Sequence, residues 1–194
     1  MVSQFLSPHQ VGLLGDLDFD FPEGTHAIGR LDRDSEGLLL LTTNSKITRL
    51  LFQSLVPHTR TYLVQVRNKI NEQTVQQLQT GVDIEVEGGK MYTTAPCSVA
   101  IVEKPADLFP APFNSSAYIQ SSWLLMTLTE GKHRQVRKMV AAVNHRCMRL
   151  IRLSIEDLAL GDLQPGEVKE LSEADFFTLL KLDCTEFNPT SAAE

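Results

Sequence analysis

The sequence predicts an α+β fold built around a largely antiparallel sheet. Most stretches of periodic hydrophobicity repeat every two residues, as strands do, and only a few repeat at the spacing of a helix. The strands do not alternate regularly with helices, as they would in a parallel βαβ fold. With 194 residues, 42% of them hydrophobic and 22% charged, the chain has the size and composition of one globular domain.

The first half of the chain contains clear signals for strands and helices. Residues 38–42, four leucines and a threonine behind Gly37, predict a strand that is buried on both faces. Polar and apolar residues alternate over 60–67, with Arg60 and Tyr62 on one face. The other expected elements are a loop-dominated entry at 7–25, a helix over 45–55 and a helix over 71–79 that Asn71 caps.

The second half repeats these signals. We expect strands over 91–102, 122–129, 148–155 and 167–171, a surface loop over 103–117, a helix after Gly131, a helix beginning at Ser172 and a disordered tail over 188–194. The helix after Gly131 has two stripes at helical spacing. One is apolar (Val136, Met139, Val140, Val143) and the other is cationic (Arg134, Arg137, Lys138).

Charge is distributed unevenly along the chain. The net charge is −6, but residues 131–152 contain seven Lys or Arg and no Asp or Glu, which leaves −13 on the remainder. Basic patches bind nucleic-acid phosphates by releasing counterions, whatever the net charge of the protein. The pattern therefore indicates either a nucleic-acid surface or a solvated basic face.

Cysteine usage and hydropathy limit the class of protein. Cys97, Cys147 and Cys184 are far apart, and no Cys or His cluster has metal-ligand spacing. The longest apolar run is far shorter than a membrane span, and the first residues do not resemble a signal peptide. We expect a cytoplasmic protein that holds no metal and spans no membrane.

The most informative segment is charge-dense. Residues 30–36 contain two arginines and three carboxylates directly before the apolar run. Charges so close to a buried element are costly unless they are paired or used. The segment is either a charged turn that enters a core strand or a site that holds a carboxylate ionised and oriented.

Three motifs resemble those of pseudouridine synthases. Gly29-Arg30-Leu31-Asp32, followed by Ser35, Gly37 and Leu38-Leu39, resembles the motif around their catalytic aspartate. The segment 130–139 resembles their basic motif, and 60–64 resembles a K-x-Y motif with arginine in place of lysine. The motifs occur in family order, and the weaker similarity runs from Gln4 to about Leu171. The branch that this chain resembles modifies ribosomal RNA and small RNA stem-loops.

The resemblance implies a fold and an activity. The fold would be a curved, mostly antiparallel mixed sheet with flanking helices, split into two lobes by a catalytic cleft. We expect one catalytic domain over 1–187, without an N-terminal RNA-binding domain. The activity would be isomerisation of a uridine to pseudouridine in ribosomal RNA, of the large subunit. The reaction transfers no electrons or phosphate, so the resemblance implies no cofactor.

The resemblance also implies roles for residues. Asp32 would act at C1′, as a nucleophile or as a base in a glycal route. Arg137 would hold that carboxylate ionised. Tyr62 would stack on the target base, although a core tyrosine is the alternative. Arg30 would enter the space left by the flipped nucleotide, and its alternative is a salt bridge with Asp34 or Glu36.

Structured RNA is the expected partner of a monomeric protein. The candidate RNA-binding residues share a positive charge and are Arg30, Arg60, Lys132, Arg134, Lys138, Arg146 and Arg149. Arg149 and Arg152 fall on opposite faces of an ideal strand, so at most one belongs to a single patch. The alternative function is a non-catalytic RNA-binding or ribosome-assembly factor. Retention of Asp32, Tyr62 and Arg137 together favours the enzyme, because binding alone needs no acid in the cleft.

Overall fold

The computed structural model describes residues 3–53, 57–111 and 120–182. Cys184, the expected tail and the ends of the expected helix 45–55 and loop 103–117 lie outside these ranges. The helices are α1 (Lys46–Gln53), α2 (Glu72–Thr80), α3 (Gln135–Ala142) and α4 (Glu173–Leu179). The strands are β1 (His26–Ile28), β2 (Glu36–Gly37), β3 (Leu40–Thr42), β4 (Arg60–Arg67), β5 (Asp83–Glu85), β6 (Met91–Thr93), β7 (Ser98–Val102), β8 (Ser121–Leu128), β9 (Cys147–Ile155) and β10 (Leu158–Ala159).

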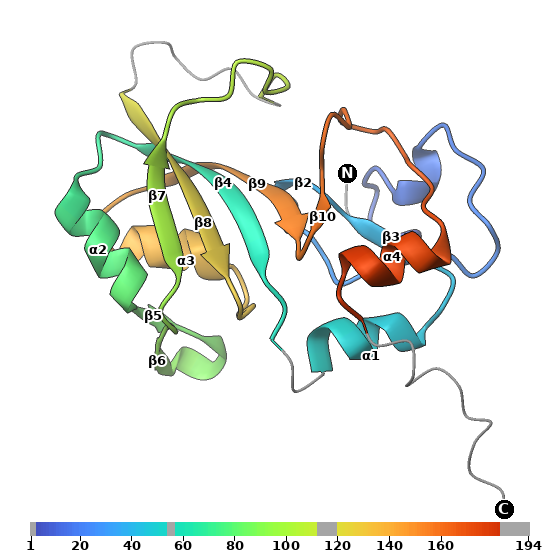
Figure 1. Cartoon of the computed structure of the whole chain (residues 1–194), viewed down its shortest axis with the longest axis horizontal. Helices are drawn as coiled ribbons and strands as arrows, with labels where there is room; N and C mark the ends of the chain where they lie inside the picture. Colours follow the sequence, from blue (N-terminus) through green and yellow to red (C-terminus); the bar gives the residue numbers. More distant parts are fainter. Residues whose placement is uncertain (1–2, 54–56, 112–119, 183–194) are drawn as a thin grey trace, which may run out of the picture.

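The main sheet is mixed but largely antiparallel, which confirms the predicted fold class (Figure 1). Its strand order is β10-β9-β4-β8-β7, and the short β2 pairs in parallel with β9. β1 pairs with β3, and β5 pairs with β6, in two separate antiparallel ribbons. The chain first joins the main sheet at β2. The first residue of β2, Glu36, is the last residue of the charge-dense segment 30–36.

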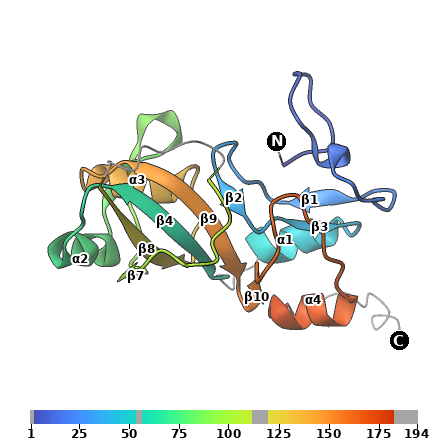
Figure 2. The same ribbon diagram turned by 90° about the horizontal axis from the view of Figure 1, so that it is seen from above.

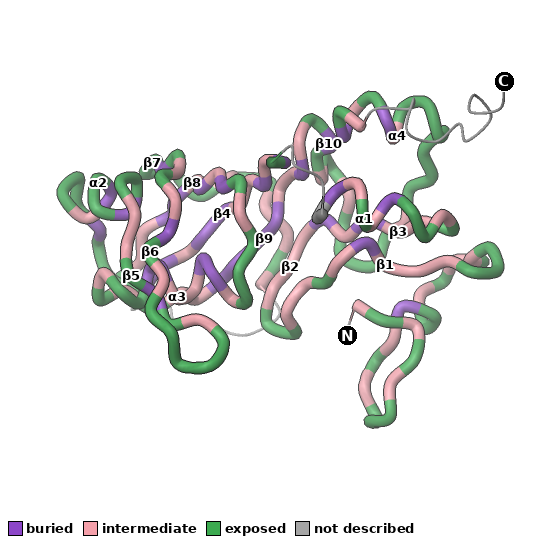
Figure 3. Tube along the Cα trace, turned by 90° about the horizontal axis from the view of Figure 1, so that it is seen from below, coloured by how far each residue is buried: buried purple, intermediate pink, exposed green. Residues whose placement is uncertain are grey.

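Strand β4 lies between β8 and β9 and shows why the alternating sequence forms a strand. Val64 and Val66 are fully buried on one face. They pack in a core cluster with Val136, Met139 and Val140, the predicted apolar stripe of α3. Helix α2 contributes to the same cluster, so both helices cover one face of the sheet. Figure 3 shows this burial running along β4, β9 and α3.

The predicted helix caps are present. The Asn71 side chain accepts a hydrogen bond from the backbone N–H of Thr74 at 2.9 Å, and Ser172 accepts one from Asp175 at 3.1 Å. Gly81 ends α2 with φ of +109°, and a Cβ there would lie 2.4 Å from the Thr94 carbonyl oxygen. Local side-chain chemistry therefore determines where these helices begin and end.

A second core cluster lies where α1 and α4 pack beside the β1–β3 ribbon (Figure 2). Ile28, Leu40, Ile47, Leu51 and Phe177 are buried in it. Ile155, at the end of β9, and Leu158 in β10 belong to the same cluster. The long strand β9 therefore contributes residues to both of these core clusters. Strand β2 pairs with the middle of β9, and the segment that contains Asp32 directly precedes β2.

The predicted strand over 38–42 is wrong as a single element. The chain pairs with β9 at Glu36–Gly37, leaves the sheet at Leu38-Leu39 and joins β1 at Leu40–Thr42. Gly37 has φ of +95°, and a Cβ there would lie 2.4 Å from the Arg152 carbonyl oxygen. The run of leucines thus lies where the chain passes from the main sheet to the β1–β3 ribbon. It is not a single strand buried on both faces.

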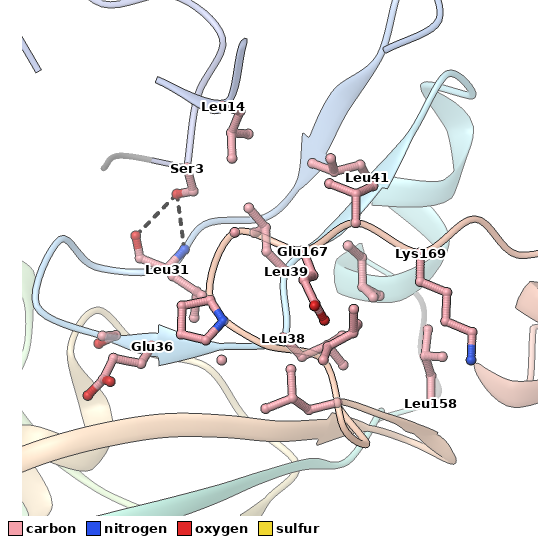
Figure 4. Close-up of a pocket in the computed structure, with 18 of the residues that line it drawn as sticks. Ser3, Leu14, Leu31, Glu36, Leu38, Leu39, Leu41, Leu158, Glu167 and Lys169 are labelled. Carbon is pink, nitrogen blue, oxygen red and sulfur yellow. Dashed lines mark hydrogen bonds between the residues drawn. The ribbon is translucent and has the colours of Figure 1, made fainter. Parts of the chain in front are cut away.

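Two other strand predictions need correction. The stretch 91–102 is split into β6 and β7, because Pro96 and its neighbours leave the ladder. Residues 167–171 form an irregular segment instead of a strand, with Glu167 and Lys169 on a loop beside a cavity (Figure 4). Strand β10, which no sequence signal predicted, has only two residues and pairs with β9.

Candidate active site

Asp32 lies in the turn that joins β1 to β2. The backbone N–H of Ser35 donates to the Asp32 carbonyl at 2.8 Å, which closes the turn. The Ser3 hydroxyl bonds both backbone groups of Leu31, at 3.1 and 3.2 Å (Figure 4). The Asp32 side chain is 30% exposed and lines a cavity of about 1650 Å³. Hydrogen bonds therefore fix the backbone of the turn at Leu31 and at Asp32, while the Asp32 carboxylate remains accessible.

Two arginines from the start of α3 face this turn. Arg134 Nη1 lies 3.7 Å from Asp32 Oδ2. The same guanidinium binds Asp34 in a fork, with Nη1–Oδ1 at 2.8 Å and Nη2–Oδ2 at 2.7 Å. Arg137 Nη1 lies 3.4 Å from Asp34 Oδ2, and Arg137 Nη2 donates to the Asp34 carbonyl. The site thus contains two carboxylates and two guanidinium groups.

The electrostatics follow from these contacts. The hydrogen bond from Arg134 holds the pKa of Asp34 below its ordinary value, with partial burial acting in the opposite direction. The same hydrogen bond raises the pKa of Arg134. The Asp34–Arg134 pair therefore remains ionised across the neutral pH range.

The predicted pairing of Arg137 with Asp32 is wrong in this structure. Arg137 contacts Asp34 instead, and Arg134 is the cation that lies beside Asp32. Arg134 has φ of +55° at the N-cap of α3, and Arg137 follows one turn later. Both side chains therefore reach the same turn, where Asp34 extends toward them. The i, i+3 spacing of the arginines predicted a shared face but not which carboxylate each would meet.

A hydrogen-bond network around Glu130 fixes the loop that precedes α3. Glu130 Oε2 accepts from the Tyr92 hydroxyl at 2.6 Å, and Glu130 Oε1 accepts from the Ala95 N–H at 3.0 Å. Gln135 is buried, donates to Glu130 and accepts from the Lys132 N–H at 2.8 Å. The hydrogen bond to Glu130 raises the pKa of Tyr92. No motif in the sequence pointed to this network, since Tyr92 lies on a distant hairpin.

Tyr62 lies on the face of β4 that α3 covers and is half-buried. It is directly opposite Arg152 in β9. Burial lowers the pKa of Arg152 and of Arg60, and in both cases the nearby Tyr62 partly offsets the effect. The described residues that line the Asp32 cavity do not include Tyr62. Its role at the target base stays a prediction.

Two of the side chains predicted to contact RNA, those of Arg60 and Arg149, are buried inside the fold. Arg60 is 7% exposed and donates to the His58 carbonyl at 3.4 Å. Arg149 is 3% exposed and forms a fork with Glu36, with Nε–Oε1 at 3.0 Å and Nη2–Oε2 at 2.7 Å. Its guanidinium also lies over the Phe109 ring. Arg149 therefore joins β9 to β2 instead of facing solvent.

The remaining cations are more accessible. Arg30, Lys132 and Arg146 are exposed. Lys138 is half-buried and donates to the Glu85 carbonyl at 2.7 Å. The alternative salt bridges of Arg30 with Asp34 or Glu36 are absent from the described part of the chain. Only some of the cations in the basic segment 131–152 are therefore exposed to solvent.

Two other kinds of feature are absent from residues 3–53, 57–111 and 120–182. No group of three or more His, Cys, Asp or Glu side chains there is arranged to hold a metal ion. None of the helices described there is long and apolar enough to cross a membrane.

Comparison with known proteins identifies the class. The family model described as RNA pseudouridylate synthase matches residues 16–142, which include Asp32, Tyr62, Arg134 and Arg137. The chain therefore belongs to this family, and the resemblance inferred from the motifs is confirmed. A crystal structure of a pseudouridylate synthase superimposes with a TM-score of 0.67 at 26% identity, covering 83% of this chain and 63% of that one.

The similar curated proteins are more specific. The chain is 40% identical over 148 residues to ribosomal large subunit pseudouridine synthase E of Vibrio parahaemolyticus, covering 75% of this chain and 60% of the relative. The protein of that name from Vibrio vulnificus is 39% identical over 80% of this chain and 64% of its own length. That of Xanthomonas axonopodis is 34% identical over 85% of each. The chain thus matches less than two thirds of the two Vibrio proteins.

Proposed function

We propose that this protein isomerises a specific uridine of large-subunit ribosomal RNA to pseudouridine. The observation that carries the proposal is Asp32, an accessible carboxylate in the family motif, on a tied turn beside the Arg134 guanidinium. The names of its relatives, which span 34–40% identity, support the large subunit as the source of the substrate.

The chemistry needs an ionised, oriented carboxylate. The C1′–N1 bond breaks with its electron pair on the uracil, the base turns, and C5 then bonds to C1′ and loses its proton. Asp32 would either add to C1′ or remove a proton from the sugar to give a glycal. Both routes require the carboxylate form of Asp32, and the Arg134 guanidinium lies 3.7 Å from Asp32 Oδ2.

RNA would approach over the turn and the start of α3. The target nucleotide must leave its stack before C1′ can reach Asp32. We propose that Tyr62 stacks on the extruded base and that Arg30, which is exposed, occupies the vacated position. Lys132 and Arg146 are exposed and would contact phosphates.

We also propose that the protein acts on RNA as a monomer. The large apolar side chains that are exposed among the described residues are Leu6, Met91, Ile101 and Leu171, which lie on four separate segments. Scattered exposure of this kind does not form the contiguous patch typical of a stable interface. Light scattering at micromolar concentration should give the mass of one chain.

The catalytic proposal is tested with purified protein and transcribed large-subunit rRNA. Wild type should generate pseudouridine at one position, detected by carbodiimide labelling and blocked primer extension. Asp32→Asn keeps the shape but removes the charge, so it should bind the RNA and form no product. Asp107→Asn, at an exposed loop position, serves as the matched control and should retain activity. An Asp32→Asn protein within about ten-fold of wild type, roughly 1.4 kcal/mol in barrier, would refute the assignment.

A further inference from the structure

Asp34 is the acceptor that both arginines at the start of α3 share. Its carboxylate receives two parallel hydrogen bonds from Arg134, at 2.8 and 2.7 Å. Its backbone carbonyl and Oδ2 meet Arg137. A bidentate fork of this kind fixes the orientation of a guanidinium as well as its distance. Asp34 therefore links the turn that contains Asp32 to the start of α3 through Arg134 and Arg137.

Within the described residues, neither arginine has another strong anchor for its head group. The Arg134 side chain is 36% exposed, so without a partner its long chain would occupy many rotamers. The Arg137 side chain is 12% exposed, and its Nε makes no hydrogen bond within the described residues. Its terminal nitrogens contact only Asp34 and Ser35 in that part of the chain. The position of both guanidinium groups at this turn thus depends on Asp34.

We propose that Asp34 is a positioning residue for the isomerisation. Its carboxylate clamps Arg134 and Arg137 against the turn, and this places a guanidinium beside the reacting carboxylate of Asp32. The inference rests on the proposed function of Asp32. Asp34 touches neither the base nor the sugar and acts only through the two arginines.

A positioning role of Asp34 and a purely electrostatic role predict opposite effects of Asp34→Asn. Removing its negative charge makes the site more positive, which by itself attracts RNA phosphates. A charge effect alone would therefore leave the reaction as fast as before and tighten RNA binding. If the reaction instead slows while binding is retained, the cause is that the guanidinium groups are no longer fixed.

The experiment compares Asp34→Asn, Asp34→Glu and a charge-matched control. Glu103→Gln removes one negative charge from an exposed position next to the edge strand β7. The Glu103 side chain takes part in none of the ion pairs among the described residues. Single-turnover pseudouridine formation with saturating protein measures the chemical step, and filter binding of the same rRNA fragment measures affinity. Asp34→Asn should slow the chemical step by at least about ten-fold, with affinity equal to or tighter than wild type. Asp34→Glu should recover part of the rate, and Glu103→Gln should match wild type in rate.

Several results would overturn the inference. These are an Asp34→Asn rate within two-fold of wild type, a loss confined to affinity, or a lower rate that is explained by unfolding of the Asp34→Asn protein at the assay temperature. Failure of Asp34→Glu to exceed Asp34→Asn would also contradict a role that depends on the carboxylate. A wild-type protein that makes no pseudouridine would refute the proposed function itself, whereas an active wild type with an unaffected Asp34→Asn removes only this inference.

Discussion

Gly37→Ala should destabilise the protein strongly, because Gly37 lies where β2 meets β9. Its φ of +95° is strained for any residue with a Cβ, at a cost of about 1–2 kcal/mol. The new methyl group would also lie 2.4 Å from the Arg152 carbonyl oxygen and 2.8 Å from its nitrogen. Both contacts are with backbone, so the strands must separate.

Separation would break the hydrogen bonds that surround Gly37. The Leu38 N–H donates to the Arg152 carbonyl at 2.9 Å, and the buried Arg152 Nε donates to the Leu38 carbonyl at 2.8 Å. A neutral bond contributes about 1 kcal/mol and one to a charged group about 1.5–3 kcal/mol. The total expected decrease in the free energy of unfolding is therefore about 3.5–6 kcal/mol, a large share of the stability of a single domain.

The matched control is Gly24→Ala. Gly24 has φ of +80°, but a Cβ there would meet nothing within 4 Å, so only the conformational cost applies. Urea unfolding followed by circular dichroism should show a decrease in stability that is about 2 kcal/mol or more larger for Gly37→Ala than for Gly24→Ala. Equal decreases would show that the approach of β2 to β9 is not as close as described, and the reasoning would fail.

Three further predictions follow from the same site and its surroundings. Arg149→Met should cost about 3–5 kcal/mol in urea unfolding, because it leaves the Glu36 carboxylate without its buried partner; a cost below about 1 kcal/mol would contradict the burial of this pair. The pKa of Asp34 is lowered in the folded state, so its contribution to stability is present above its unfolded pKa and disappears as pH falls through the folded pKa. Asp34→Asn should therefore flatten the acid side of the stability–pH curve, and an unchanged curve would count against the Arg134 fork. Arg146→Glu should weaken RNA binding and reduce the salt slope by about 0.7–0.9 for each phosphate that the variant no longer neutralises, whereas Lys69→Glu should leave the slope unchanged; equal effects would place the RNA surface elsewhere.

Local signals in the sequence were sufficient for elements whose determinants are local. The strand over 60–67 was predicted with its bounds, because alternation is a property of the segment itself. The caps at Asn71 and Ser172 were predicted for the same reason, since a capping side chain bonds a backbone group only three residues away. Three residues of the predicted apolar stripe, Val136, Met139 and Val140, are buried in α3, whereas the fourth, Val143, is its half-buried C-cap.

Features that depend on distant partners were not predictable. The run of leucines after Gly37 looked like one strand, but β9, more than a hundred residues later, pairs with the residues before it and β1 pairs with its end. The acid-free segment 131–152 looked like a surface patch, although Glu36 neutralises Arg149 and Asp34 binds Arg134 and Arg137. The charges within one segment cannot show which carboxylates the fold brings to it.

The motifs located the site better than the individual roles. The three motifs place Asp32, Tyr62 and the arginines of α3 within one family domain. They did not show that Arg134 would lie beside Asp32, because that depends on its left-handed backbone at the start of α3. Family motifs thus identify the chemistry, and the geometry decides which guanidinium serves which carboxylate.

We propose that Asp32 carries out uridine isomerisation in large-subunit rRNA. This proposal is tested most directly by mapping pseudouridines in rRNA from cells that lack this protein and that receive either wild type or Asp32→Asn. We predict that one large-subunit position loses its pseudouridine, that wild type restores it, and that Asp32→Asn does not. Restoration by Asp32→Asn, or an unchanged pseudouridine map in the cells that lack the protein, would contradict it.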